Sequence, residues 1–235
     1  MDSHRKAAMI VGLLFIIAMT ASLLGGPVLT QSILGASDYL DKISANQNQV
    51  LIGVLFKFIA AAASAGIAIS LYPILKKHNE GLALGSVGFR LIEAVFYLVA
   101  ALGTLSLLSL SQEYASAGSA AASTFQIIGT SMHSVIIWAG FVLGVISFCL
   151  GALMYYYVFY QSKLIPQWLS VWGMIGIVLL LAMVLSIMFD EGPVKEPSGI
   201  RMLLAVPIAL QEMVLAVWLI VKGFNPSAIA SGSAK

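Results

Sequence analysis

The sequence predicts an all-α, polytopic membrane protein in which six transmembrane helices form one bundle. Of its 235 residues, 60% are hydrophobic and only 9% are charged, and its mean hydropathy is +0.99. A soluble domain has roughly a quarter of its residues charged, so this chain lacks the polar groups that would cover its surface in water. Six separate apolar segments each approach or exceed the roughly 20 residues that a helix needs to cross a bilayer.

The first apolar segment, residues 7–29, follows a basic start and has small residues near its end, as a signal peptide does. It is about 23 residues long, whereas the apolar region of a signal peptide has about 7 to 15. We therefore interpret it as an uncleaved first transmembrane helix.

Five further apolar segments follow, at residues 50–75, 85–110, 134–157, 167–189 and 201–221. Backbone groups in lipid must find their hydrogen-bond partners within their own segment, so these segments predict helices rather than strands. The semi-polar stretch 123–133 is compatible with an earlier start of the fourth helix. Polar loops are predicted at 30–49, 76–81, 111–122 and 190–200. Residues 1–225 then form a single domain, and residues 226–235 form a flexible tail.

The distribution of basic residues predicts that both termini are cytoplasmic. With the N-terminus inside, seven Lys and Arg residues fall on the cytoplasmic side and three on the other, which agrees with the positive-inside rule. The inner group is Arg5, Lys6, Lys76, Lys77, Lys163, Lys222 and Lys235, and the outer group is Lys42, Lys195 and Arg201.

Five ionisable residues lie within the predicted spans: Lys57, Arg90, Glu93, His133 and Glu212. A full charge that faces lipid at the centre of a helix costs roughly 2.5 to 3.5 kcal/mol on insertion scales. We therefore expect these side chains to face the interior of the bundle.

Small neighbours support this expectation, because small residues mark the faces on which membrane helices approach one another. Such residues recur at helical spacing beside three of the ionisable residues. They are Gly53, Ala60, Ala61, Ser64 and Ala68 beside Lys57, Gly140, Gly144, Ser147 and Gly151 beside His133, and Ala205, Ala209 and Ala216 beside Glu212.

The acidic residues Glu93 and Glu212 are expected at a similar depth, because their helices run in opposite directions. Arg90 lies one turn before Glu93 on the same face, and Tyr97 lies one turn after it. Lys57 is expected roughly 8 Å further out. Two cations and two carboxylates then form a polar cluster with no net charge.

The candidate ligand- or ion-binding residues are Lys57, Arg90, Glu93, Tyr97, His133, Gln211 and Glu212. In this interpretation Glu93 and Glu212 titrate and Arg90 is their counter-charge, while Lys57 and His133 form an outer gate or relay. Pro207, five residues before Glu212, is expected to kink the sixth helix.

Three functions are compatible with these residues. The first is binding or translocation of a small ion, a proton or an amphiphile. The second is a structural or accessory subunit in which the charges only specify packing, since Lys57 and Arg90 can also extend toward a membrane surface. The third is an intramembrane hydrolase or transferase that uses His133 and a carboxylate as acid and base. The sequence assigns no catalytic residue, so an enzyme is the less favoured of the three.

Other chemistry finds little support in the sequence. One intramembrane histidine cannot supply the three or four ligands of a zinc site, and no glycine-rich phosphate loop is present. Cys149 is the single cysteine, so we expect no disulfide and interpret Cys149 as a small buried hydrophobe. A net charge of +2 does not suggest nucleic acid. The expected partners are the lipid bilayer and a small-molecule or ion ligand, without metal or cofactor, and the oligomeric state stays open.

Two motifs, "NEGLALGSVGFRLIEA" at 79–94 and "LQEMVLAVWLIVKGFN" at 210–225, together with His133, resemble a bacterial integral-membrane family catalogued as domain of unknown function 4386. The residues that match are Arg90, His133, Glu212, Trp218, Lys222 and Gly223. The resemblance implies a six-helix fold in the bacterial cytoplasmic membrane and implies no activity. It also implies a small residue at position 211, where this chain has Gln211.

Overall fold

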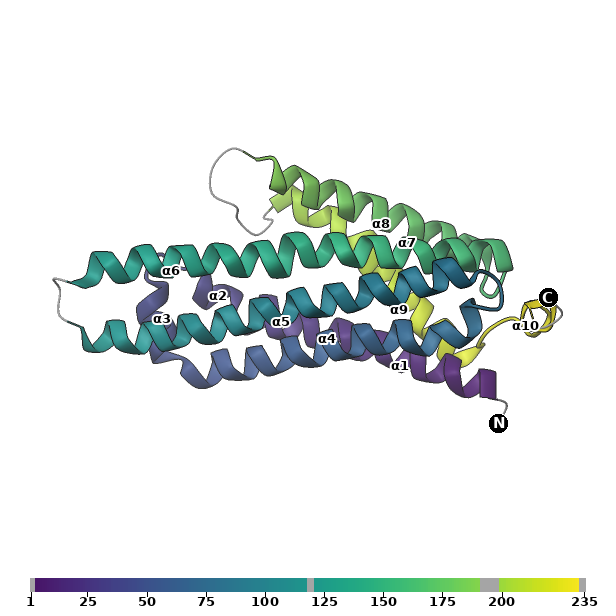
Figure 1. Ribbon diagram of the computed structural model, residues 1–235, viewed down its shortest axis with the longest axis horizontal. Helices are drawn as coiled ribbons and strands as arrows, with labels where there is room; N and C mark the ends of the chain where they lie inside the picture. The colour runs from purple at the N-terminus through teal and green to yellow at the C-terminus, as the bar shows by residue number, and fades with distance from the viewer. Residues whose placement is uncertain (1–2, 118–120, 191–198, 233–235) are drawn as a thin grey trace.

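The computed structural model contains six helices that are long and apolar enough to cross a membrane (Figure 1). They span His4–Leu34, Gln47–Leu75, Glu80–Ser116, Ala122–Ser162, Gln167–Met188 and Arg201–Val221. The structure describes residues 3–117, 121–190 and 199–232, of which none lies in a strand. These observations confirm the predicted all-helical, multi-pass membrane fold.

Three of the six spans are single α-helices: α4 (Gln47–Leu75), α5 (Glu80–Ser116) and α8 (Gln167–Met188). The other three change helix type along their length. The first span consists of α1 (Ser3–Leu23), the π-helical segment η1 (Leu24–Val28) and α2 (Gln31–Leu34). The fourth consists of α6 (Ala122–Ile136), the π-helical segment η3 (Ile137–Leu143) and α7 (Gly144–Ser162), so its earlier start is confirmed. The sixth consists of the 3-10 segment η4 (Gly199–Ala205) and α9 (Val206–Val221).

Both ends of the described chain lie at the same end of the bundle, which we call the terminal end (Figure 1). Arg5 on α1 donates hydrogen bonds to the carbonyls of Leu219, Ile220 and Val221 at 3.2, 2.6 and 3.0 Å. The last carbonyls of an α-helix have no partner within the helix, so Arg5 satisfies those of α9. Gly223 ends the segment with a φ of +75°, where a Cβ would also lie 2.9 Å from the Arg5 guanidinium. A glycine fits this position best.

The segment 30–49, predicted as a polar loop, is mostly helical, and that prediction was wrong. It contains α2 and the helix α3 (Tyr39–Ala45), whose Leu40 and Ile43 are buried. The helix α5 has 37 residues and is about 56 Å long, well beyond the roughly 30 Å of the hydrocarbon core. The far end of α5 therefore projects beyond the core, and α3 packs against it. A second apolar cluster forms there, and its members include Ile33, Leu34, Leu107 and Leu108.

The main apolar cluster occupies the terminal end and includes Tyr155, Tyr156 and Phe159. Cys149 belongs to it and is fully buried, as expected. The segment predicted as a flexible tail contains the helix α10 (Pro226–Gly232), and its Ala228 joins the same cluster. Of the charges used to predict the orientation, Lys195 and Lys235 lie outside the described residues. The membrane side of each end therefore stays a prediction.

Pro207 lies where a proline is compatible with an unkinked helix. It lies in the first turn of α9, where an N–H has no partner within the α-helix, so its missing N–H breaks no α-helical bond. The irregularity of this span is instead the change from the 3-10 segment η4 to α9 just before Pro207.

Gly12 is predicted to be essential for the contact between α1 and α9. A Cβ at this position would lie 2.7 Å from the carbonyl oxygen of Ala216 and from Ile220. We expect Gly12→Ala to lower the free energy of unfolding by about 1–3 kcal/mol because it overpacks this contact. Denaturant titration in detergent micelles measures the change. Gly88→Ala on the exposed face of α5, where a Cβ meets nothing within 4 Å, is the matched control. Equal stability of the two variants would contradict the close approach.

Candidate ligand-binding cavity

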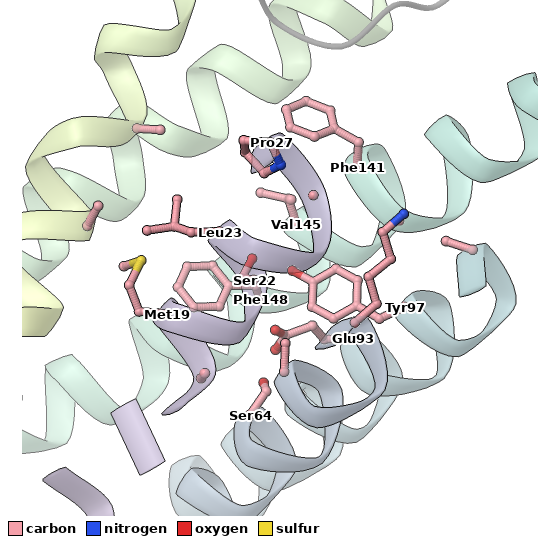
Figure 2. Close-up of a pocket in the computed structure, with 18 of the residues that line it drawn as sticks. Met19, Ser22, Leu23, Pro27, Ser64, Glu93, Tyr97, Phe141, Val145 and Phe148 are labelled. Carbon is pink, nitrogen blue, oxygen red and sulfur yellow. The ribbon is translucent and has the colours of Figure 1, made fainter. Parts of the chain in front are cut away.

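A cavity of about 410 Å³ lies among the spans, and parts of α1, η1, α4, α5, η3, α7, α8, η4 and α9 line it (Figure 2). One buried part of its wall is polar and contains Ser64, Arg90 and Glu93, all at most 3% exposed. Most of the remaining wall is apolar, with Met19, Leu23, Phe141, Val145 and Phe148 among its residues. The cavity therefore has a polar floor and apolar sides.

The floor is built around an ion pair between Arg90 and Glu93 on α5. Arg90 Nη1 lies 3.1 Å from Glu93 Oε2, and the two side chains are 2% and 3% exposed. The spacing of three residues places both side chains on one face of α5. An arginine keeps its charge in a protein, so its burial here requires the neighbouring carboxylate.

The side chain of Arg90 lies against α7. Its guanidinium carbon is 4.7 Å from the ring centroid of Phe148, a geometry that allows a cation–π interaction. A Cβ at Gly151, one turn further along α7, would lie 3.1 Å from Arg90 Cγ. The small residue at position 151 thus makes room for the arginine stem.

Ser64 on α4 and Tyr97 on α5 surround the same carboxylate. In Figure 2 the side chains of Ser64, Glu93 and Tyr97 lie together at the wall formed by these two helices. Tyr97 in turn lies against Gly144, where a Cβ would be 2.8 Å from its ring. Gly144 and Gly151, from the small-residue face predicted beside His133, therefore make room for Tyr97 and Arg90.

Two charged groups of the floor keep polar atoms without a protein partner. Arg90 Nε and Glu212 Oε1 are buried, and neither has a hydrogen-bond partner among the described residues. Glu212 projects from α9, lines the cavity and lies within electrostatic range of Arg90 and Glu93. Because a buried polar atom without a partner is costly, these two atoms are candidates to bind a further polar group.

Five of the predicted site residues line the cavity: Lys57, Arg90, Glu93, Tyr97 and Glu212. Lys57 is half-buried on α4 and shares the cavity wall with Ala60 and Ser64 of its own stripe. The expected convergence of α4, α5 and α9 is therefore present in the structure.

His133 is not among the residues that line the cavity. Its ring stacks on that of Tyr39 in α3, with the centroids 5.9 Å apart and the planes at 23°. This contact joins α6 to the short helix that the sequence analysis interpreted as loop. The position of His133 on a face with small residues could not reveal that partner.

Gln211 is also absent from the cavity wall and is fully buried between three helices. The Tyr156 hydroxyl on α7 donates to Gln211 Oε1 at 2.5 Å, and Gln211 Nε2 donates to the Leu169 carbonyl on α8 at 3.0 Å. Gly173 leaves room for the Tyr156 ring, because a Cβ there would lie 2.5 Å from it. Gln211 therefore joins α7, α8 and α9 beside the cavity.

The two π-helical segments both border the cavity, although the apolar pattern of the sequence predicts neither of them. Gly26 and Pro27 of η1 and Ile137, Gly140 and Phe141 of η3 are wall residues. The π-helix is rare and occurs frequently at functional sites. Pro27 has no N–H to donate to an α-helical hydrogen bond. The Thr30 hydroxyl donates a hydrogen bond to the Gly25 carbonyl at 2.8 Å. The Gly-Gly-Pro sequence at 25–27 was the signal that could have located η1.

Among the described residues, no three His, Cys, Asp or Glu side chains gather in a way that could hold a metal ion. The cavity instead offers one ion pair, further charged groups at its wall and a large apolar surface.

The fold and the buried charges define a multi-pass integral membrane protein with a polar-floored cavity among its spans. Residues 10–223 match the model of the family described as domain of unknown function DUF4386. The chain belongs to this family, as the motifs at 79–94 and 210–225 predicted. No curated protein and no solved structure matches the chain.

The ion pair makes Glu93 important for stability. We expect Glu93→Gln to lower the free energy of unfolding by about 3 kcal/mol, because Arg90 then loses its carboxylate partner in a buried site. The double variant Arg90→Met/Glu93→Gln should lose less than Glu93→Gln alone, since no buried cation remains. Glu113→Gln, on the exposed far end of α5, is the control. Denaturant titration in detergent measures the free energy of unfolding of each variant. A double variant that loses more than Glu93→Gln alone would show that the two residues do not interact.

Gln211 is predicted to stabilise the bundle. Gln211→Leu leaves the Tyr156 hydroxyl and the Leu169 carbonyl without their partner, and we expect a loss of about 1–3 kcal/mol in the free energy of unfolding. Gln112→Leu, which removes an exposed hydrogen bond to Gln47, should change it by less than about 0.5 kcal/mol. Unfolding in detergent micelles compares the two. An unchanged stability of Gln211→Leu would exclude the joining role.

Proposed function

We propose that this protein binds a small amphiphile in the cavity, with the polar head at Arg90, Glu93 and Glu212. One observation carries the proposal: a single cavity combines a buried ionic floor, which keeps unsatisfied polar atoms, with mostly apolar sides. An amphiphile has the same division into a polar and an apolar part. Small-molecule sites are also mostly apolar with a few polar groups that fix the ligand orientation.

The size of the cavity favours a molecule over a single ion or proton. Its volume of about 410 Å³ lies within the range of roughly 300–1,000 Å³ that is usual for ligand pockets. A water molecule takes up about 30 Å³ of liquid, so the space would hold on the order of ten waters. A simple ion also has no need of the aromatic wall formed by Phe141 and Phe148.

The exposed rim supports access from the bilayer. Ser22, Leu23 and Pro27 from the first span and Met202 from η4 line the cavity and are exposed. On membrane-spanning helices, exposed apolar side chains face lipid. The first and sixth spans contact each other near Gly12 and Ala216, on the terminal-end side of this rim. We infer that the ligand enters between the opposite halves of these spans.

The alternatives are supported less well. A packing-only role for the charges predicts a dry and fully paired network, whereas Arg90 Nε and Glu212 Oε1 border a cavity without partners among the described residues. A hydrolase or transferase would need His133 near a carboxylate, and His133 instead stacks on Tyr39. Translocation of the bound molecule is an extension of the binding function.

We further propose that both termini are cytoplasmic and that the membrane is the bacterial cytoplasmic membrane. Arg5, Lys76, Lys163 and Lys222 gather at the terminal end, which agrees with the positive-inside rule.

A photolabelling experiment tests the binding. The probe is a long-chain alcohol with a diazirine in its alkyl chain, added to vesicles that contain the purified protein. We expect peptide mapping to find label on Val145 or Phe148. Ala209→Trp should lower this cavity labelling about tenfold, because the indole fills a site that must be empty for binding.

Leu210→Trp is the matched control, since Leu210 neighbours Ala209 but is exposed and is not among the cavity-lining residues. It should leave the labelling of Val145 and Phe148 unchanged. Label that is confined to lipid-facing residues, or equal cavity labelling in both variants, would overturn the proposed function.

A further inference from the structure

Two adjacent tyrosines on α7 lie between the cavity floor and the terminal end. Tyr155 and Tyr156 are both fully buried, and their ring centroids are 4.5 Å apart. Tyr155 lies one turn after Gly151, against which the stem of Arg90 packs, and it interacts electrostatically with Arg90 and Glu212. Tyr156 continues the series through Gln211 to the Leu169 carbonyl. Leu169 is only two residues from the start of α8 at Gln167. Polar groups therefore follow one another from the floor to within one turn of that helix end.

Several polar atoms along this route form no well-formed hydrogen bond in the described part of the chain. The hydroxyls of Tyr155, Ser86 and Ser170 are buried and find no hydrogen bond of good geometry among the described residues. Ser86 lies one turn before Arg90 on α5, and Ser170 directly follows Leu169 on α8. A buried hydroxyl without a partner is unfavourable, and phenylalanine or alanine would avoid that cost. Internal water satisfies such groups in proteins, typically with about three hydrogen bonds each.

We propose that Tyr155 and Tyr156, together with internal water, form a proton path from Glu212 to the terminal end of α8, and that Gln211 positions the Tyr156 hydroxyl in it. The Glu212 carboxyl gives its proton to the Tyr155 oxygen or to a water beside it, and each following hydroxyl or water accepts one proton and releases its own. No bond other than O–H changes, and every tyrosine returns to its neutral form once its hydrogen bonds reorient. The path deepens the proposed function. It rests on that function only because Glu212 must lie at a cavity that water can enter.

Several ionisable groups lie around Glu212 at the cavity. The charged groups that face the cavity with it are Lys57 from α4 and Arg90 and Glu93 from α5. The neutral titratable groups nearby are Tyr97 on α5 and Cys149, Tyr155 and Tyr156 on α7. The helix α8 contributes no ionisable residue. Arg90 pairs with Glu93, and Glu212 Oε1 has no hydrogen-bond partner among the described residues.

Proton flux into vesicles tests the path. Purified protein is reconstituted with a pH-sensitive dye inside, and valinomycin with a potassium gradient drives protons across the membrane. We expect the wild type to exceed protein-free vesicles, and Tyr155→Phe to reduce the flux at least about tenfold, because it removes one proton-carrying hydroxyl. This variant breaks no well-formed hydrogen bond, so it should fold as the wild type does.

Tyr157→Phe is the matched control, because Tyr157 is the next residue on α7 but is 45% exposed and bonds only to Gln161 among the described residues. Its flux should equal that of the wild type. Tyr156→Phe should also abolish flux, although the lost bond to Gln211 lowers its stability as well. A wild-type flux equal to that of protein-free vesicles, or an undiminished flux in Tyr155→Phe, would refute the path.

Photolabelling of the same Tyr155→Phe vesicles separates the two proposals. If the path is correct, the variant loses proton flux and keeps the label on Val145 or Phe148, because these residues lie in the cavity above the tyrosines. Flux without cavity labelling in the wild type would refute amphiphile binding and leave the path standing. Cavity labelling without proton flux in the wild type would refute the path and leave amphiphile binding standing.

Discussion

The buried ion pair of Arg90 and Glu93 is the constraint on which the rest of the structure depends. A guanidinium keeps its proton, and in an apolar interior it needs a carboxylate and further polar contacts. Its position on α5 therefore requires a groove on α7, which Gly151 provides, and an aromatic face, which Phe148 provides. The ion pair thus determines which faces of these two helices meet. It also brings Ser64 on α4 and Glu212 on α9 to the same place.

The cavity lies where three of the surrounding spans are irregular. The first span changes to a π-helix at η1, the fourth does so at η3, and the sixth begins as a 3-10 segment at η4. All three irregular segments contribute wall residues. Regular α-helices with one continuous small-residue stripe would pack closely over the ion pair. Helix irregularity and buried charge together therefore leave an open space with a polar floor.

The cavity and the tyrosines below it suggest a division of the bundle along the membrane normal. Toward the terminal end, Tyr155, Tyr156 and Phe159 are fully buried between the spans. Toward the far end, the space stays open and its rim is exposed on membrane-spanning helices. A molecule bound in the cavity would therefore meet lipid on one side and an aromatic barrier on the other.

The all-helical class, the six spans, the family and five of the residues that line the cavity follow from the amino-acid sequence alone. The reason is energetic: a charge in an apolar span is so costly that its presence identifies an interior face, and helix periodicity then places Lys57, Arg90 and Glu93. Only the tertiary structure decided the roles of His133 and Gln211. Their partners, Tyr39 and Tyr156, are far away in the sequence, and spacing within one helix does not show which neighbour a polar side chain meets. The cavity volume also depends on the tertiary structure, because irregular segments of three different spans contribute to the cavity wall.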